Sequence, residues 1–464
     1  MKRWTFGLVA GLAALLGSSA TVAAGGAAVA GASVAPVPLL RMMSHKAFVT
    51  PPTTVDCEQQ IGIACYSPAQ FQRAYNLHPL YKKGLTGKGQ TIVIVDSFGY
   101  ANIRHELRVF DRAFHLPAPP SFRIIHPAGP IPPFNPTKRP AMVGWAQETS
   151  LDVEYSHAIA PGANILLVET PVAETLGVEG FPQIVKAENF VVNHHLGNVI
   201  SQSFGAPEAG FPSAHSILAL RSAYKNAARH GVSVLAGSGD AGASGAKTLD
   251  PSGFALTFFL HRAPSWPPTD PLVTAIGGTQ LHLDANGNRT APDNVWNDTA
   301  LFNSPAASGG GLSTVFPRPF YQGSVAGTVH NRRGIPDISM SAAVDGAALV
   351  FLDKGAAQGP AGFYLIGGTS ESSPEFAGIV AIADQWAGHG LGLLNPALYR
   401  MEAAGKSGIV DVTAGNNTVT FPQGGSTHTV RGFNAGPGYD LASGVGTINA
   451  AKFVPELVQA SHHH

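Results

Sequence analysis

The stretch TIVIV at residues 91–95 decides the fold class of this chain. All five residues are β-branched and the last four are apolar, a composition typical of a short strand buried on both faces. Three further runs of this kind lie at residues 165–168, 199–202 and 232–236. Helix-length segments separate these runs, among them residues 102–114 and 213–229. The alternation predicts an α/β fold with a central, mainly parallel sheet flanked by helices.

A proline-rich segment interrupts this alternation. Residues 117–140 contain nine prolines around one short strand candidate at residues 122–125. Because proline lacks the backbone N–H that a sheet ladder requires, we expect this segment to be an irregular excursion on the surface.

The composition excludes several classes of protein. The 464 residues include 29 Lys and Arg against 29 Asp and Glu, and charged residues make up only 12% of the chain. About 25% charged residues is usual. Because basic and acidic residues are equal in number, the chain has no excess positive charge to attract nucleic acids. Hydrophobic residues reach 44%, so the chain is neither disordered nor collagen-like despite its 54 Gly and 36 Pro.

The first residues have the pattern of a secretory signal. Met1-Lys2-Arg3 is followed by an apolar run at residues 6–16 and then by small residues suited to cleavage. No later segment is expected to span a membrane, which predicts a secreted protein. We divide the chain into a signal peptide, an Ala/Gly/Pro-rich linker-like segment, one domain and a His-rich tail, at residues 1–24, 25–64, 65–460 and 461–464.

Cys57 and Cys65 are the two cysteines of the sequence. In an oxidising compartment they can close one small loop, and two free cysteines with a structural role are the alternative. Their spacing is not CxxC, so the sequence supports neither thiol redox chemistry nor a cysteine zinc site.

Residues 145–160 (WAQETSLDVEYSHAIA) are expected to form a helix that ends before a Pro-Gly pair. Glu148 and Asp152 are four residues apart, which directs both carboxylates to one face of the helix. Like charges at this spacing are mildly unfavourable, and a solvated acidic face is the ordinary explanation. The apolar neighbours Leu151 and Ala158 favour a packed helix, in which two acids without a role are less expected.

The segment GGTSESSP at residues 367–374 precedes an apolar helical run at residues 376–383. A serine between a Gly-rich turn and a helix start has backbone N–H groups beside it, so Ser370 is a candidate nucleophile. An ordinary capping loop is the alternative, with Pro374 in the first helical turn and Ser372 or Ser373 as the cap. The GxSxG elbow of α/β-hydrolases does not occur in the sequence.

The loop GSGDAG at residues 237–242 directly follows an expected strand and satisfies the spacing GxGxxG. A dinucleotide site would need a helix after this loop, whereas residues 243–253 contain two glycines and a proline. We therefore discount a dehydrogenase. What remains is Asp240 at the carboxyl end of a parallel strand, where α/β sheets place their ligands.

Asp411, Val412 and the run Gly436-Pro437-Gly438-Tyr439-Asp440 combine two carboxylates with Gly-rich backbone carbonyls. Oxygen donors of this kind suit calcium, although Gly/Asp turns without a metal are more common. HExxH and GxxxxGK[ST] do not occur, so the sequence favours neither a zincin nor a nucleotide hydrolase.

Taken together, the chain resembles the sedolisins, secreted serine-carboxyl peptidases with a subtilisin-like fold. The segments that carry this resemblance, in order, are YSPAQFQRAYNL at 66–77, SQSFGAPE at 201–208, SGDAG at 238–242, VTAIGGT at 273–279, SGGGLS at 308–313, PDIS at 336–339, GGTSESSP at 367–374 and GYD at 438–440. The resemblance implies a three-layer fold over nearly the whole chain after the signal peptide.

The resemblance also implies roles for individual residues. Ser370 matches the nucleophile, Glu148 the general base, Asp152 the acid that supports this base, and Asp240 the oxyanion-hole acid. One calcium ion would be held by the side chains of Asp411 and Asp440 and by the backbone oxygens of Val412, Gly436 and Gly438. An extended peptide would pair with Ser203, Phe204 and Gly205 along the cleft.

Carboxylates suit these roles because a glutamate, with an ordinary pKa of about 4.3, stays ionised in acid where histidine is already protonated. Our leading hypothesis is a secreted, monomeric endopeptidase that cleaves proteins or peptides at acidic pH through a Ser370 acyl-enzyme. A catalytically silent, calcium-stabilised secreted binding protein of the same fold is the alternative. Sedolisins commonly carry a large N-terminal prosegment, whereas residues 25–64 are too few for one, so we expect none of full length.

Overall fold

The structure is a computed structural model that describes residues 33–43 and 45–462. The predicted signal peptide and the last two residues of the His-rich tail lie outside the described residues. None of the helices within the described ranges has the length and apolar character needed to cross a bilayer.

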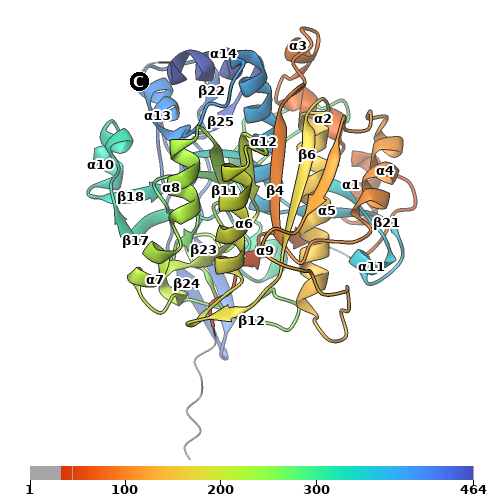
Figure 1. Cartoon of the computed structure of the whole chain (residues 1–464), viewed down its shortest axis with the longest axis horizontal. Helices are drawn as coiled ribbons and strands as arrows, with labels where there is room; N and C mark the ends of the chain where they lie inside the picture. The colour runs from red at the N-terminus through yellow and green to blue at the C-terminus, as the bar shows by residue number, and fades with distance from the viewer. Residues whose placement is uncertain (1–32, 44, 463–464) are drawn as a thin grey trace, which may run out of the picture. The chain divides into compact units, whose positions relative to one another are not determined.

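The centre of the fold is an eight-stranded sheet (Figure 1). Seven strands run parallel, in the order β5 (Phe122–Ile125), β6 (Asn164–Thr170), β4 (Thr91–Ser97), β9 (Val199–Gln202), β11 (Ser233–Gly237), β15 (Thr274–Gln280) and β19 (Ile338–Ser341). The short strand β16 (Asn294–Val295) pairs antiparallel with β15 at one edge. The TIVIV run forms most of β4, near the middle of the sheet.

Helices cover both faces of this sheet. The long helices α5 (Ala141–Ile159) and α12 (Thr369–Ala387) pack on one face, and α6 (Phe181–Asn193) and α8 (Ser222–Arg229) pack on the other. Ile92 and Ile94 of β4 belong to the hydrophobic cluster of the first face, whereas Val93 and Val95 belong to that of the second. This alternation explains why all four side chains are fully buried, and it confirms the predicted three-layer α/β class.

Other helices surround these layers. The expected helix at 213–229 is two helices, α7 (Ala214–Ala219) and α8, separated at Leu220 and Arg221. Before the sheet come α1 (Thr54–Gln60), α2 (Pro68–Ala74) and α3 (His78–Tyr81); α4 (Ile103–Phe114) follows β4, and α13 (Asn395–Ala403) and α14 (Ala450–Ser461) follow α12.

The proline-rich segment contributes more to the fold than expected. Its strand candidate forms β5 with the predicted bounds, and β5 pairs parallel with β6 as the edge strand of the central sheet. An edge strand tolerates proline-rich flanks because one of its sides makes no ladder hydrogen bonds.

Helix α12 begins earlier than predicted, at Thr369, so Pro374 lies inside the helix and neither Ser372 nor Ser373 caps it. The residue before the helix is Gly368, whose φ of 111° suits glycine. Pro374 has no N–H to donate to the carbonyl four residues earlier, that of Ser370. This carbonyl instead accepts a hydrogen bond from the Ser203 hydroxyl at 3.4 Å.

Two short strands come from the segment expected to be a linker. β1 (Val37–Pro38) pairs antiparallel with β10 (Phe204–Pro207), which also pairs with β14 (Ser265–Trp266). β2 (Arg41–Met42) pairs antiparallel with β21 (Gly362–Gly367), which pairs with β20 (Ala347–Leu352) and, through it, with β3 (Cys65–Tyr66). Residues 37–42 are therefore integrated into the fold.

Candidate active site

Ser370 lies in the first turn of α12, directly after β21 and the Gly367-Gly368 turn. A Cβ on Gly368 would lie 2.5 Å from both Asp240 Oδ2 and the Leu39 carbonyl oxygen, so the close approach of these groups requires glycine. The Ser370 side chain is fully buried, and its hydroxyl donates to the Ser203 carbonyl oxygen at 3.3 Å. The Ser370 backbone N–H donates to the Leu39 carbonyl oxygen at 2.9 Å.

Glu148 projects from α5 toward Ser370, because α5 and α12 pack against one another. Burial raises the pKa of Glu148 well above its ordinary value, the charge of Asp152 raises it further, and the nearby Ser370 hydroxyl lowers it. Within the described residues, neither Glu148 carboxyl oxygen has a hydrogen bond of good geometry. The Ser370 hydroxyl is nonetheless near enough to Glu148 to lower the pKa of this carboxyl.

Asp152 lies one helical turn after Glu148 and accepts a hydrogen bond from the Ser203 hydroxyl at 2.6 Å. Burial and the charge of Asp96 raise its pKa well above the ordinary value. The carboxyl groups of Asp96 and Asp152 contact one another, and burial raises the pKa of Asp96 to about 7. Two carboxyls this close share a proton more readily than they both ionise.

Asp96 was not among the residues predicted from the sequence. It directly follows the TIVIV run, at the carboxyl end of β4, and accepts a hydrogen bond from the Thr149 hydroxyl at 3.0 Å. The signal that identified Asp240, an acid at the carboxyl end of a parallel strand, also applies to Asp96.

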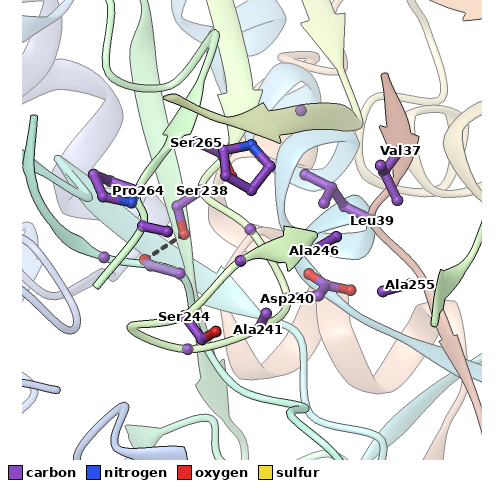
Figure 2. Close-up of a pocket in the computed structure, with 18 of the residues that line it drawn as sticks. Val37, Leu39, Ser238, Asp240, Ala241, Ser244, Ala246, Ala255, Pro264 and Ser265 are labelled. Carbon is purple, nitrogen blue, oxygen red and sulfur yellow. Dashed lines mark hydrogen bonds between the residues drawn. The ribbon is translucent and has the colours of Figure 1, made fainter. Parts of the chain in front are cut away.

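Asp240 follows β11 and binds Thr369, the first residue of α12 and the neighbour of Ser370. Its Oδ1 accepts two hydrogen bonds of 2.8 Å, from the backbone N–H and the hydroxyl of Thr369. Its Oδ2 is buried and has no partner within the described ranges. Burial raises the pKa of Asp240 to about 7, although the charge of Arg41 opposes this. Figure 2 shows Asp240 and Leu39 lining the same pocket.

Of the expected peptide-binding stretch, residues 203–205, Gly205 lines this pocket. Gly205 pairs with Val37 of β1. The Phe204 side chain, however, is fully buried against Trp145 and Phe181 in the core. Only the backbone of Phe204 is therefore available to pair with a peptide. The Ser203 side chain is likewise turned away from the cleft strand, toward Asp152.

The GxGxxG loop is a structural part of this site. The Ser238 hydroxyl donates to the Gly309 carbonyl oxygen at 2.7 Å (Figure 2), and the Gly239 N–H donates to the Thr369 hydroxyl at 3.2 Å. Strand β12 (Ala246–Leu249) occupies the stretch that a dinucleotide fold would make a helix.

Both carboxylates of the expected calcium site accept hydrogen bonds from the backbone of the loop at residues 436–440. The Gly438 N–H donates to Asp411 Oδ2 at 2.9 Å, and the Gly436 N–H donates to Asp440 Oδ2 at 3.1 Å. Burial raises the pKa of Asp440, so a bound cation would stabilise its ionised form. The described residues contain no group of three or more His, Cys, Asp or Glu arranged for a metal. Two carboxylates with backbone carbonyls nevertheless fit the oxygen coordination of calcium.

Comparison with known proteins identifies the relatives of this arrangement. The fold matches the solved structure of Pseudomonas sedolisin, a serine-carboxyl proteinase complexed with two molecules of pseudo-iodotyrostatin, with a TM-score of 0.67 and 25% identity over 86% of this chain and 99% of that one. The chain is therefore similar to the sedolisins in fold and in sequence. The fold is therefore subtilisin-like, as predicted.

Sequence comparison agrees with this assignment. The chain is 29% identical to kumamolisin from Bacillus sp. (strain MN-32) over 409 residues, which cover 87% of this chain and 65% of kumamolisin. It is 32% identical to sedolisin from Pseudomonas sp. (strain 101) over 271 residues, 58% of this chain and 42% of that sedolisin. The chain thus spans less than two thirds of the length of these sedolisin-family relatives. No family model matches it.

Proposed function

We propose that the chain is a serine-carboxyl endopeptidase that cleaves proteins or peptides at acidic pH. One observation carries this proposal: a peptide carbonyl oxygen, that of Leu39, accepts a hydrogen bond from the N–H of Ser370, near Asp240 Oδ2, which has no partner among the described residues. The Ser370 backbone is therefore beside a peptide carbonyl, Asp240 lies near the same carbonyl, and Glu148 lies near the Ser370 hydroxyl. The silent binding protein is not favoured, because the relatives are peptidases.

The first chemical step is attack by the Ser370 oxygen on the substrate carbonyl carbon. Glu148 accepts the hydroxyl proton and later delivers it to the leaving amine. Asp152 and Asp96 are positioned behind Glu148 as a second carboxyl pair, and the Ser203 hydroxyl holds Asp152 in place. Water then attacks the acyl-enzyme, with Glu148 as base, and releases the product.

The negative charge that develops on the substrate carbonyl oxygen is stabilised from two directions. The Ser370 N–H donates from the start of α12, and protonated Asp240 donates from Oδ2. Removing one such donor in comparable sites costs about 10²–10³ in rate. The proposal therefore requires Asp240 to be protonated during the reaction.

These roles define the pH range. With a pKa of about 7, Asp240 loses its proton and its donor function above neutral pH. Glu148 must be ionised, and burial raises its pKa well above the ordinary value on which the sequence-based argument relied. Activity at acidic pH thus requires Glu148 to ionise at a lower pH than Asp240, which the burial of Glu148 opposes, and Asp240 limits activity on the alkaline side.

We also propose one structural calcium ion, held by the side chains of Asp411 and Asp440 and the carbonyl oxygens of Val412, Gly436 and Gly438. The ion would neutralise two carboxylates and tie their loop together. Export as a monomer is proposed on the N-terminal signal pattern and on a disulfide, an oxidised pair that persists outside the cytosol.

The test of the proposed function compares wild type with Ser370→Ala on a denatured protein substrate between pH 3 and pH 7. Wild type should release peptides, and Ser370→Ala should be at least about 10⁴-fold slower. Ser426→Ala is the matched control, because Ser426 is exposed on the hairpin strand β24 (Ser426–Val430), and it should retain full activity. Equal rates for wild type and Ser370→Ala would refute the proposal.

A further inference from the structure

The amino ends of the parallel strands form the end of the molecule opposite the candidate active site. Asp96 and Asp240 mark that site, at or just after the carboxyl ends of β4 and β11. The helices that connect parallel strands return across the sheet, so their last turns lie beside the amino ends of the strands. In Figure 1 this end is at the top, where α3 and α14 lie.

Four segments of the chain meet at this end, and we call the surface that they form the amino-end surface. They are the residues before β4 and the last residues of α6, α8 and α12 with the loops that follow, namely 82–90, 193–198, 228–232 and 385–392. The Lys88 N–H donates to Gln385 Oε1 at 3.0 Å, and the Asn198 amide donates to Gln90 Oε1 at 2.8 Å. These hydrogen bonds tie the start of β4 to the ends of α6 and α12.

Every Asp, Glu, Lys or Arg position in the amino-end surface is basic. The four segments contain no Asp or Glu, and their exposed lysine and arginine side chains are Lys82, Lys83, Lys88 and Arg229. The whole chain has 29 Lys and Arg against 29 Asp and Glu, so this excess of positive charge is local. Like charges gathered in this way repel one another unless an anion lies among them.

Exposed histidines add to this charge in acid. They are His194, His195, His230 and His389. The ring centroids of His195 and His230 are 5.9 Å apart, which brings the ends of α6 and α8 together. Histidine gains a positive charge as the pH falls from about 8 to about 5, and two charged rings at this distance repel. An anionic group bound between them removes this repulsion.

Two of these rings are already oriented by the backbone. His194 Nδ1 lies 2.8 Å from the Phe190 carbonyl oxygen, and His230 Nδ1 lies 2.9 Å from that of Asn226. Because a carbonyl oxygen only accepts, Nδ1 is the donor in both contacts. Each Nε2 is left for a ligand, and in acid it carries a proton to donate.

Two aromatic side chains lie among these cations. Trp386 is 39% exposed, with Lys83 Nζ 5.2 Å from its ring centroid. Phe190 is 36% exposed and stacks on His194. Rings that are partly covered by charged groups lack the broad apolar face that inserts into a bilayer. Their electron-rich faces instead suit the C–H groups of a sugar ring.

The acids packed against this surface do not cancel its charge in acid. Asp384 of α12 and Glu188 of α6 are buried, and burial raises the pKa of each to about 8. Both are therefore protonated at pH 5. On the neighbouring helix α14, Glu456 accepts a hydrogen bond from a backbone N–H at 2.8 Å. His462, at the end of α14, lies beside His389 with ring centroids 5.9 Å apart and adds one more titrating cation.

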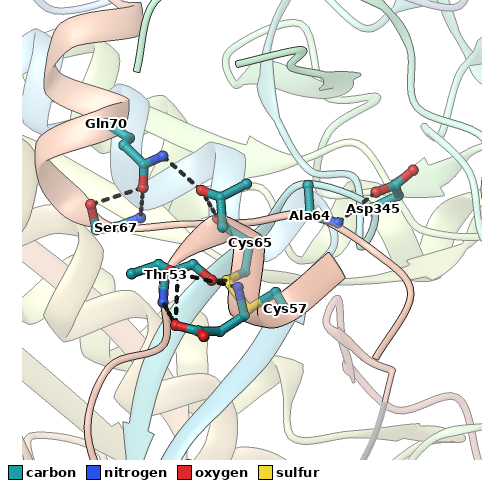
Figure 3. Close-up of a disulfide and its surroundings, with 9 residues drawn as sticks. Thr53, Cys57, Ala64, Cys65, Ser67, Gln70 and Asp345 are labelled. Carbon is teal, nitrogen blue, oxygen red and sulfur yellow. Dashed lines mark hydrogen bonds between the residues drawn. A yellow bond between two sulfur atoms is a disulfide. The ribbon is translucent and has the colours of Figure 1, made fainter. Parts of the chain in front are cut away.

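The surface is held in place before a ligand binds. The Cys57–Cys65 disulfide joins α1 to β3 and settles the question that the sequence left open (Figure 3). Directly after it, the Ser67 N–H and hydroxyl donate to Gln70 Oε1 at 2.9 and 3.0 Å and fix the start of α2 (Figure 3). Helices α2 and α3 then lead into residues 82–90, which hydrogen bonds tie to the end of α12. Little ordering is needed on binding, so little affinity is lost to it.

We propose that the amino-end surface binds an anionic polysaccharide, and that this binding tightens in acid as its histidines gain charge. The lysine, arginine and histidine side chains donate to the carboxylates or sulfates of the polymer. Its sugar rings lie against Trp386 and Phe190. Because the catalytic groups lie at the opposite edge of the sheet, the candidate active site faces away from the bound polymer. This inference does not depend on the peptidase function.

The test measures binding of the chain to polygalacturonate by isothermal titration calorimetry, with uncharged dextran as the control polymer. Wild type should bind polygalacturonate at pH 5, and at least about fivefold more weakly at pH 7.5. Raising the salt from about 50 to about 300 mM at pH 5 should weaken binding at least about tenfold. Equal affinity at the two pH values, or binding to dextran as tight as to polygalacturonate, would overturn the proposal.

Two charge variants locate the binding site. One removes three permanent charges from the amino-end surface, by Lys82→Gln, Lys83→Gln and Arg229→Gln. The matched control removes as many charges from exposed residues elsewhere, by Lys138→Gln, Arg139→Gln and Lys247→Gln. The first variant should weaken binding at pH 5 at least about tenfold, and the control should bind within about twofold of wild type. Equal weakening by both variants, or none by the first, would refute the assignment to this surface.

A histidine variant tests the pH dependence. The double substitution His195→Gln and His230→Gln should match wild type at pH 7.5 and bind at least about threefold more weakly at pH 5. Circular dichroism at both pH values checks that each variant is folded. A pH dependence as steep as that of wild type would refute the role of these two histidines.

Vesicles of phosphatidylglycerol and phosphatidylcholine distinguish a lipid partner from a polysaccharide. Wild type should bind them more weakly than polygalacturonate at the same concentration of anionic groups. Equal or tighter binding to the vesicles would overturn the choice of a polysaccharide. Binding to neither would overturn the inference as a whole and leave the peptidase function untouched.

Discussion

Replacing Asp240 with Asn changes the proposed oxyanion donor without changing the shape of its side chain. Asn retains an oxygen to accept the two hydrogen bonds from Thr369. It places an amide N–H group where Asp240 has the Oδ2 that lacks a partner within the described residues. The substitution therefore converts a donor that titrates into one that does not.

The size of the effect follows from the pKa of about 7 that burial gives Asp240. At pH 8 about one tenth of the wild-type molecules keep this proton, and each further pH unit lowers that share tenfold. Wild-type kcat/KM should fall in proportion, whereas Asp240→Asn should show no fall from this group. Asp240→Ala removes the donor at every pH and should cost about 10²–10³ in kcat, or about 3–4 kcal/mol of transition-state stabilisation.

The assay measures initial rates on an internally quenched peptide from pH 3 to pH 9 for the three proteins, with circular dichroism at each pH to confirm that the fold persists. The expected result is an alkaline limb in wild type that is missing in Asp240→Asn. An unchanged alkaline limb in Asp240→Asn, or an Asp240→Ala variant as active as wild type, would refute the role assigned to Asp240.

Three further predictions concern stability and the close packing of the site. Burial raises the folded-state pKa of Glu188 to about 8. Protonated Glu188 therefore makes its full contribution to the free energy of unfolding below about pH 4. This contribution is lost as the pH rises to 8, at up to about 1.4 kcal/mol per pH unit. In a Ser370→Ala background, Glu188→Gln should flatten this dependence in denaturant titrations at pH 4, 5.5 and 7, and parallel curves would contradict it. Gly368→Ala places a Cβ 2.5 Å from Asp240 Oδ2, so kcat should fall at least about 100-fold; near-normal kcat would show that the approach is not required. Removing calcium with a chelator should lower the Tm of wild type but not that of Asp440→Ala, and an unchanged wild-type Tm would argue against the ion.

Several features of the site were predictable because they depend on residues close together in the chain. The four-residue spacing of Glu148 and Asp152 puts both on one side of α5 wherever that helix packs. The apolar run before Asp240 predicts a buried strand, and the strand predicts a ligand-facing loop at its end. In each case the feature is predicted by the spacing of residues that are close together in the chain.

Other features depend on groups that are far apart in the chain. Asp96 and Asp152 come from neighbouring elements of the fold, and no spacing in the sequence indicates that their carboxyls touch. The start of α12 was predicted too late because Pro374 and the serines suggested a cap. The tertiary contacts of Ser372 with Ser341 and of Ser373 with Ser201 take up these hydroxyls instead.

The sequence by itself determined the layers of this protein, because β-branched runs such as residues 91–95 can be buried on both faces only inside an α/β sandwich. It also determined which residue types were available for chemistry, and resemblance to a family assigned their roles. The tertiary structure alone decided that Leu39 lies on Ser370, since this contact depends on the pairing of β1 with β10 and of β2 with β21. Strand pairing over such separations is set by the packing of the whole sheet, and local sequence does not encode it.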